Sequence, residues 1–167
     1  MLKALDTAAL RFMRTRGHWR PLEHAVVRFS SFGEHSMLWL AVAVIGLSFD
    51  RRRAGVYRRL ARTIVVVEVA NALAKVAIAR RRPRLRGLPA LVETRSQRSC
   101  PSAHASSSFA AAMVLSSDWP RAPVYALATA MALTRPYLGV HYPSDVLLGA
   151  ILGSAIGRQL NKGRRIE

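Results

Sequence analysis

Residues 132–148 read ALTRPYLGVHYPSDVLL, an apolar stretch in which Arg135, His141 and Asp145 are the only charged or imidazole side chains. His141 and Asp145 are four residues apart, which on a helix places them on one face, one turn apart. A carboxylate beside an imidazole can bind one ring nitrogen and leave the other free as a nucleophile or base. Arg135 could bind the anion that the imidazole attacks. A structural ion pair at a helix end is an equally good interpretation of this stretch alone.

The distribution of charge along the chain indicates a membrane protein. The 167 residues are 51% apolar and carry a net charge of +17. The basic residues form blocks at 51–53, 58–62, 80–86 and 158–165, and long apolar runs separate these blocks. This pattern is typical of membrane spans joined by basic loops, with a soluble nucleic-acid-binding protein as the alternative from a different class. The single cysteine, Cys100, excludes an intramolecular disulfide and a multi-cysteine metal site, and we expect no metal and no cofactor.

We predict an all-α fold, a polytopic membrane bundle of about five spans that forms a single domain over residues 1–167. The expected spans are residues 34–49, 60–79, 101–117, 124–138 and 143–160, with a tight basic loop at 50–59. The motifs discussed below lie between residues 60 and 160. We therefore expect a multi-pass protein of the cell membrane that contacts membrane lipids and binds no nucleic acid.

The N-terminal segment, residues 1–31, is expected to lie at the membrane interface. Residues 1–16 predict an amphipathic helix, and Pro21 is expected to open a second short helix that reaches Ser31. The first helix has an apolar face and a polar face, formed respectively by Leu2, Leu5, Ala9, Phe12 and Met13, and by Lys3, Thr7, Arg11 and Arg14.

Polar residues inside the second expected span should face the interior of the bundle. Glu68, Asn71 and Lys75 follow one another at steps of three and four residues, so they share one face of a helix. An ionised group facing lipid would be costly, so we expect Glu68 to pair with Lys75 or Asn71 in a structural role.

A stripe of small residues marks the last expected span. Gly149, Gly153 and Gly157 are each four residues apart, which allows another helix backbone to approach closely. We interpret this stripe as helix packing inside the bundle, although it would also allow a homo-oligomer.

Three separate pieces of sequence are expected to meet at one membrane face. The first contains Lys75, Arg82 and Pro83. Lys75 and Arg82 are seven residues apart, so both could project from one helix face before Pro83 ends the helix. The second is Pro101, Ser102, Ala103 and His104, where a proline at the first helical position leaves free amides, a hydroxyl and an imidazole around a helix N-terminus. The third is Arg135, His141 and Asp145. Cations, free amides and two imidazoles, without metal-ligand spacing, suit a tetrahedral phosphate ester.

The three pieces, in this order and spacing, resemble the type 2 phosphatidic acid phosphatase (PAP2) superfamily of membrane lipid phosphatases. The resemblance covers residues 60–160, and YLGVHYPSDVLLGA is very similar to the third motif of the family. Two positions depart from the family pattern. Ala103 stands where glycine is usual, and Thr134 stands where serine is frequent.

The resemblance implies a two-step, metal-independent hydrolysis through a phosphohistidine. In that scheme His141 attacks phosphorus, Asp145 orients the ring, and His104 protonates the leaving alcohol and then activates water. The phosphoryl oxygens are bound by phosphate ligands at Lys75, Arg82, Ser102, Ala103 and Arg135, with the amide of His104.

The substrate expected from the resemblance is a lipid-linked phosphate. The short chain and compact loops are similar to small bacterial members, so the first expectation is decaprenylphosphoryl-5-phosphoribose, a precursor for cell-wall arabinan. Polyprenyl diphosphate and phosphatidylglycerol phosphate are the enzymatic alternatives. A catalytically silent membrane scaffold that retains the motifs is the alternative from a different class.

Overall fold

The computed structural model describes residues 2–162, without the side chain of Leu2, so the basic tail expected up to Arg165 lies outside the described residues. The described chain is all-helical, as predicted. Its elements are α1 (Leu2–Thr15), α2 (Arg20–Ser31), a short 3-10 turn η1 (Glu34–Ser36), α3 (Met37–Phe49), η2 (Arg51–Arg53), α4 (Ala54–Ile78), α5 (Ala103–Leu115), α6 (Arg121–Tyr137) and α7 (Pro143–Asn161).

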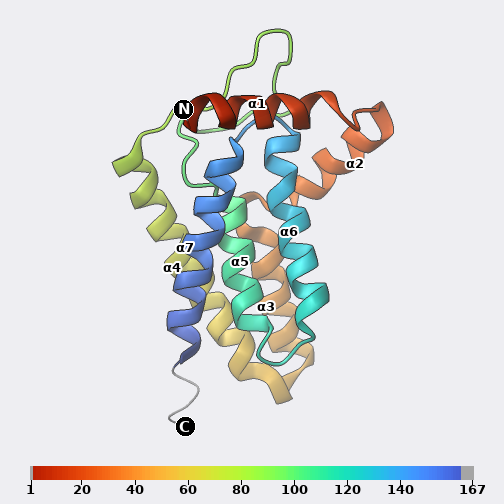
Figure 1. The fold of residues 1–167 in the computed structure, drawn as a ribbon. Helices are drawn as coiled ribbons and strands as arrows, with labels where there is room; N and C mark the ends of the chain where they lie inside the picture. Colours follow the sequence, from red (N-terminus) through yellow and green to blue (C-terminus); the bar gives the residue numbers. More distant parts are fainter. Residues whose placement is uncertain (1, 163–167) are drawn as a thin grey trace.

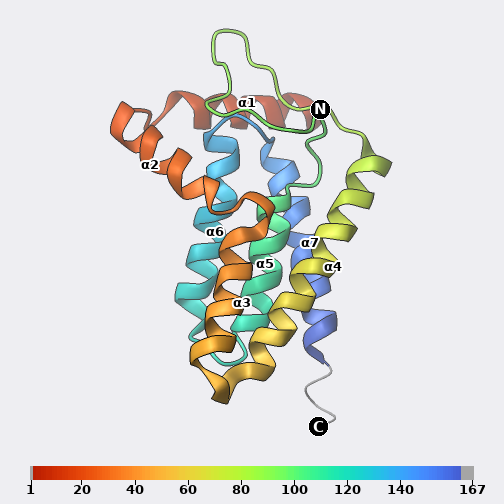
Figure 2. The ribbon, with the colours of Figure 1, turned by 180° about the vertical axis from the view of Figure 1, so that it is seen from behind.

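The long helices form a bundle around α5, and α1 lies across one end of it (Figures 1 and 2). Helix α5 contacts α3, α4, α6 and α7, so it is the central element. The polypeptide between α4 and α5 extends past α1 at the same end of the bundle (Figure 1). That end therefore collects α1, this loop, and the turn between α6 and α7.

The glycine stripe of α7 packs against the backbone of α5. A Cβ atom built on Gly153 would lie 2.0 Å from the carbonyl oxygen of Ser106, and one on Gly149 would lie 2.5 Å from that of Ser102. Gly157 meets the Ala110 carbonyl in the same way. The packing interpretation is confirmed, and this face is not free to serve a homo-oligomer.

Helix α1 forms where it was expected, but its orientation differs from the prediction. Asp6, Leu10 and Arg14, which are four residues apart, are buried against the bundle. Leu5 and Phe12, from the predicted apolar face, are each 61% exposed. The assignment of Arg14 to the polar face was wrong, because its guanidinium is buried and donates hydrogen bonds to the carbonyls of Tyr137, the last residue of α6, and of Pro89.

The ends of α3 and α4 differ from the predicted boundaries. Helix α4 begins at Ala54 instead of residue 60, because the basic loop after α3 is closed by the short turn η2. Within the described chain, no single helix is both long enough and apolar enough to cross a bilayer alone. The segments Arg20–Ser31 and Glu34–Phe49 are together long and apolar enough for one span, but the chain bends by 53° between them. The number of spans stays a prediction.

Candidate active site

The three motif pieces come together at the α1 end of the bundle, around a cavity of about 410 Å³. Six of the eight predicted site residues line it: Lys75, Arg82, Ala103, His104, Arg135 and His141. Ser102 and Asp145 are fully buried beside it. Among residues 2–162, no group of three or more His, Cys, Asp and Glu side chains is placed to hold a metal ion. The cations that line this cavity are Lys75, Arg82, Arg95 and Arg135, and three carboxylates, Glu34, Glu68 and Glu93, line it as well.

His141 lies in the turn before α7, and its ring is held between a cation and a carboxylate. Arg82 Nη1 is 3.0 Å from His141 Nε2, and Asp145 Oδ2 is 3.6 Å from His141 Nδ1. A guanidinium can only donate, so Nε2 is the accepting nitrogen and Nδ1 carries the ring proton toward Asp145. The side chain is 3% exposed, and burial lowers the pKa of His141 to about 3. The geometry presents a neutral imidazole whose Nε2 lone pair faces Arg82.

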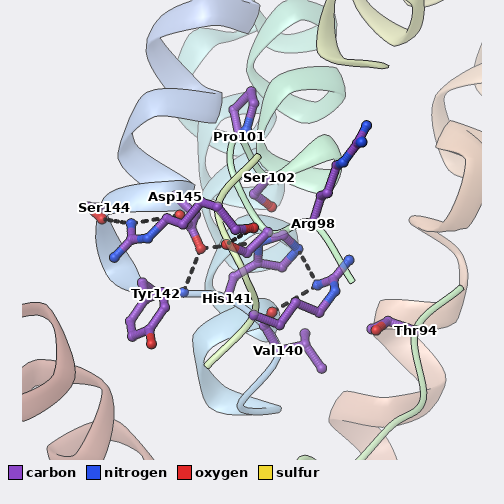
Figure 3. A network of polar contacts seen from close by, with 12 residues as sticks. Thr94, Arg98, Pro101, Ser102, Val140, His141, Tyr142, Ser144 and Asp145 are labelled. Carbon is purple, nitrogen blue, oxygen red and sulfur yellow. Dashed lines mark hydrogen bonds and ion pairs between the residues drawn. The ribbon is translucent and has the colours of Figure 1, made fainter. Parts of the chain in front are cut away.

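The predicted helical relationship between His141 and Asp145 was wrong. Helix α7 begins at Pro143, so His141 precedes the helix, and Asp145 is the third residue of its first turn. Asp145 Oδ2 accepts a hydrogen bond of 2.9 Å from the Tyr142 amide, and this capping contact fixes the carboxylate beneath the imidazole (Figure 3). The two side chains still meet, because the cap turns the chain back toward the helix start.

Lys75 and Arg82 reach the cavity from different backbone conformations. Helix α4 ends at Ile78, four residues before the predicted end, with Ala79 in the left-handed conformation at φ 50°. Arg82 follows in an extended segment, where its backbone amide donates to Gln97 and its Nη1 donates to the Val140 carbonyl at 2.8 Å. The prediction that one helix carries both cations to Pro83 was wrong, although both line the cavity.

Helix α5 presents its N-terminus to the site, two residues later than predicted. Ser102 is the N-cap and Ala103 the first helical residue, so Pro101 lies outside the helix. The Ser102 amide donates to the Asp145 carbonyl at 3.0 Å, while the buried Ser102 hydroxyl has no partner in the described chain. The first amides of a helix, here those of Ala103 and His104, have no intrahelical acceptor. This end of α5 therefore offers a hydroxyl and two amides to an anion.

Ser30 of α2 organises two of the predicted site residues, and sequence reasoning missed it. Its backbone carbonyl lies 3.0 Å from His104 Nε2. Its hydroxyl accepts hydrogen bonds from Arg135 Nη1 at 2.6 Å and from the Thr134 hydroxyl at 3.0 Å. The 2% exposed Ser30 thus fixes the orientation of one imidazole and one guanidinium. A serine at the end of a short amphipathic helix carries no local signal for this role.

Glu68 also lies at the cavity, but with a different partner from the predicted ones. Its Oε1 accepts a hydrogen bond of 2.5 Å from Ser36. The side-chain amide of Asn71 instead donates to the Ser106 hydroxyl at 2.8 Å. Within the described chain, the side chain of Lys75 forms no hydrogen bond or ion pair. The ammonium group of Lys75 is therefore available to a bound anion.

Arg80 is the second residue that sequence reasoning missed, since it was counted only as part of a basic loop. It forms ion pairs with Asp6 of α1 at 2.6 Å and with Asp145 at 2.8 Å. The available signal was on the partner: Asp6 is the only carboxylate before Glu23 in a strongly basic segment.

Comparisons with known proteins agree with this geometry. Residues 56–162 match the model of the PAP2 superfamily. The chain is 40% identical over 134 residues to decaprenylphosphoryl-5-phosphoribose phosphatase of Mycobacterium tuberculosis (strain ATCC 25618 / H37Rv), covering 77% of this chain and 72% of that protein. It is 36% identical over 120 residues to the phosphatase of the same name from Mycolicibacterium smegmatis, covering 72% and 67%.

Two solved structures share the fold. LpxE of Aquifex aeolicus superposes with a TM-score of 0.81 over 95% of both chains, at 23% identity. A transmembrane PAP2 type phosphatidylglycerolphosphate phosphatase from Bacillus subtilis superposes with a TM-score of 0.83 over 99% of this chain and 88% of that one, also at 23% identity. The family match spans all three motif pieces, whereas Gly33, Glu34 and His35, which also line the cavity, lie outside it. The chain therefore belongs to the PAP2 superfamily and is a lipid phosphatase, a phosphoric monoester hydrolase.

Proposed function

We propose that this phosphatase hydrolyses a lipid-linked phosphomonoester through a phosphohistidine at His141, and that its substrate is decaprenylphosphoryl-5-phosphoribose. The observation that carries the mechanism is the position of His141 Nε2. This unprotonated nitrogen lies 3.0 Å from Arg82 Nη1, at a cavity that Lys75 and Arg135 also line. A nucleophile and the cations that would neutralise the charge of its target therefore share one small space.

In the first step, the lone pair of His141 Nε2 attacks phosphorus and the bond from phosphorus to the leaving oxygen breaks. Arg82 exchanges its contact with Nε2 for a phosphoryl oxygen as the substrate enters. Asp145, 3.6 Å from Nδ1, stabilises the positive charge that develops on the ring. A guanidinium that first holds the nucleophile and then the phosphate keeps both aligned for attack.

His104 acts as the acid of the first step and the base of the second. Its Nε2 is held by the Ser30 carbonyl at 3.0 Å, which leaves Nδ1 for proton exchange with substrate. In the first step the ring is an imidazolium: the Nε2 proton stays on the Ser30 carbonyl, and the Nδ1 proton passes to the leaving alkoxide. Nδ1 then takes a proton from the water that attacks the phosphohistidine, so phosphate is released and both imidazoles return to their starting state.

The phosphoryl oxygens are bound by groups that lack a protein partner or can exchange one. These groups are the unpaired Lys75 ammonium, the unpaired Ser102 hydroxyl, the first amides of α5, and the guanidiniums of Arg82 and Arg135. Ala103 in place of glycine keeps its amide at the helix start, so the substitution preserves the donor. Preorganised donors of this kind stabilise the charge of the transition state without moving during the reaction.

The choice of lipid rests on the relatives. The mycobacterial proteins that share 36–40% identity are named for decaprenylphosphoryl-5-phosphoribose, whereas the Bacillus protein named for phosphatidylglycerolphosphate shares only the fold at 23% identity. Polyprenyl diphosphate and phosphatidylglycerol phosphate are the competing substrates. The exposed apolar residues along α4 and α7, among them Val65, Val69, Leu73, Leu147 and Ile151, support a multi-pass position in the cell membrane.

A substrate panel tests the assignment. Purified protein in detergent is given decaprenylphosphoryl-5-phosphoribose, a polyprenyl diphosphate and phosphatidylglycerol phosphate, and released phosphate is measured with His141→Ala as the matched blank. We expect the highest kcat/KM for the phosphoribosyl lipid, and inhibition by vanadate, which mimics the pentacoordinate phosphoryl group. A preference for either competitor would overturn the substrate, and full activity of His141→Ala would overturn the mechanism.

A further inference from the structure

Arg80 connects the N-terminal helix to the catalytic carboxylate. Its Nη1 donates to Asp145 Oδ1 at 2.8 Å and to the Ser144 hydroxyl at 2.6 Å, while its Nη2 donates to Asp6 Oδ2 at 2.6 Å. The guanidinium also lies 4.1 Å from the centre of the Tyr142 ring. All these partners except Asp6 belong to the start of α7, around His141 (Figure 3). One planar group thus holds two carboxylates from helices that are distant in sequence.

Asp6 contributes more than a single ion pair. Its Oδ1 accepts a hydrogen bond of 3.0 Å from the Ser144 amide, and its Oδ2 accepts one from the Ser144 hydroxyl. A carboxylate of α1 therefore binds a free amide in the first turn of α7, where negative charge is stabilising. Asp6 is only 9% exposed, although α1 lies across the end of the bundle. It also lies outside residues 56–162, the region that the family model matches.

The contacts of Asp145 show how this arrangement reaches the nucleophile. Arg80 binds Oδ1, the Tyr142 amide binds Oδ2, and Oδ2 is the atom that faces His141 Nδ1. Without Arg80, the fully buried carboxylate would keep one oxygen fixed and lose its only cationic partner among the described residues. The carboxylate could then rotate, and the ring above it would lose its alignment. Arg80 itself donates no hydrogen bond to His141 in the described structure, so its effect acts through Asp145.

We infer that Arg80, held by Asp6 of α1, is a positioning residue for the nucleophilic histidine, so that the docking of α1 on the bundle is needed for the full rate of hydrolysis. This inference rests on the proposed role of His141. It assigns to the N-terminal helix a part in catalysis that is separate from any contact with the membrane. Phosphate binding is expected to be unaffected, because in the described structure the side chain of Arg80 forms hydrogen bonds and ion pairs with Asp6, Ser144 and Asp145 and with none of Lys75, Ser102 and Arg135.

Steady-state kinetics of four variants test the inference. We expect Arg80→Gln to lower kcat by about 10²-fold, the size of effect that a misaligned reacting group produces, with KM unchanged within about twofold. Arg80→Lys should recover part of the loss, because it keeps the charge but can serve fewer acceptors. Asp6→Asn should lower kcat by about tenfold, and the double variant should be no slower than Arg80→Gln, since both changes break one network.

Arg81→Gln is the matched control, because Arg81 is the adjacent, exposed arginine and its side chain makes no hydrogen bond in the described structure. It should keep the parent kcat. A parent-like kcat in both Arg80→Gln and Asp6→Asn would overturn the inference, as would an additive loss in the double variant. A loss that appears only in KM would also overturn it, because it would place Arg80 among the phosphate ligands.

Hydrogen exchange of α1 separates this inference from the proposed function. Arg80→Gln should lose amide protection over residues 2–15, and unchanged protection would overturn the claim that Arg80 holds α1 in place. If the parent protein hydrolyses none of the proposed substrate, but Arg80→Gln still loses amide protection over residues 2–15, the proposed substrate is rejected and the contact between Arg80 and α1 is kept. A parent protein that is active, and remains so in His141→Ala, would reject the nucleophile and the positioning role together.

Discussion

The two ends of the helical bundle bury opposite kinds of residue. At the end away from α1, the core consists of apolar side chains such as Val56, Leu60, Ile64 and Val114. At the α1 end, the buried side chains include His104, Arg135, His141 and Asp145. Burying charged groups is unfavourable unless each finds a partner. The comparison indicates that the apolar end holds the helices in place, and that this support allows the other end to keep ionised groups at fixed distances.

Helices α4 and α5 belong to both ends, so the division runs along each helix instead of between helices. Leu60 and Ile64 of α4 lie in the apolar core, whereas Lys75 lines the cavity about three turns beyond Ile64. Helix α5 runs in the other direction, from His104 at the site to Val114 in the core. Variants at the polar end should therefore change the rate of hydrolysis, and variants at the apolar end should change the free energy of unfolding.

The largest expected effect is on activity. Replacing His141 by alanine should lower kcat by at least about 10⁴-fold, the order seen when a nucleophile is removed from a covalent mechanism. The protein should still fold, because the apolar core is untouched. Phosphate release and thermal unfolding in detergent measure the two properties. A loss of activity smaller than tenfold would remove His141 from the nucleophilic role.

A substitution at the contact between α5 and α7 should affect both properties. The Cβ of Gly153→Val would lie 2.0 Å from the Ser106 carbonyl, so the helices must separate. We expect a loss of about 3 kcal/mol or more in the free energy of unfolding, with loss of activity. The control is Ala155→Val on the exposed face of α7, which should have little effect. A stable and active Gly153→Val protein would mean that α7 does not pack on α5 through this face.

A cavity in the apolar core should affect stability alone. Leu60 is fully buried, so Leu60→Ala should lower the free energy of unfolding by about 3 kcal/mol. The kcat of the protein that remains folded should match that of the parent. Val65→Ala, at a side chain that is 60% exposed on the same helix, is the control. If Leu60→Ala slowed catalysis as strongly as it lowered stability, the proposed separation of the two ends would be wrong.

The smallest expected effect is a dependence of stability on pH. Burial lowers the pKa of His141 to about 3 in the folded protein, whereas an exposed histidine has a pKa of about 6.5. Between these values the unfolded chain binds the extra proton, so stability is lost as the pH falls below about 6.5. At pH 5 the loss from this group is about 2 kcal/mol. The parent should therefore lose about 2 kcal/mol of stability relative to His141→Gln as the pH falls from 7 to 5, measured by thermal unfolding. Stabilities that fall in parallel would contradict a buried neutral imidazole.

The sequence predicted the helices from local patterns, and it predicted the meeting of the three motif pieces from the order of the expected spans and from a family resemblance. Apolar runs and prolines indicate helices, and the resemblance of residues 60–160 to the PAP2 superfamily placed Lys75, His104 and His141 in one site. The helix ends were less predictable. The end of α4 at Ile78 depends on the left-handed Ala79 and on pairing of the following segment with residues 97–99, neither of which has a local signal.

Ser30 and Asp6, which bind site residues from outside the motifs, could not be predicted either, because no local sequence pattern marks them. Ser30 lies 105 positions from Arg135, and Asp6 lies 74 positions from Arg80. Only the folded chain places α1 and α2 over the ends of α6 and α7. The resemblance covers residues 60–160, so it gave no information about this N-terminal segment. Roles carried over from a family motif stop where the motif stops, and the structure supplies the remaining contacts.

The covalent intermediate gives the most direct test of the central claim, that His141 is the nucleophile in a cage of cations. The parent protein is mixed with substrate labelled in the transferable phosphate and quenched within the first turnover in alkali, where a phosphohistidine survives. Peptide mapping by mass spectrometry then locates the label. We expect phosphate on the peptide that contains His141 and none in His141→Ala. Label on another residue, or full turnover with no trapped phosphoenzyme, would contradict it.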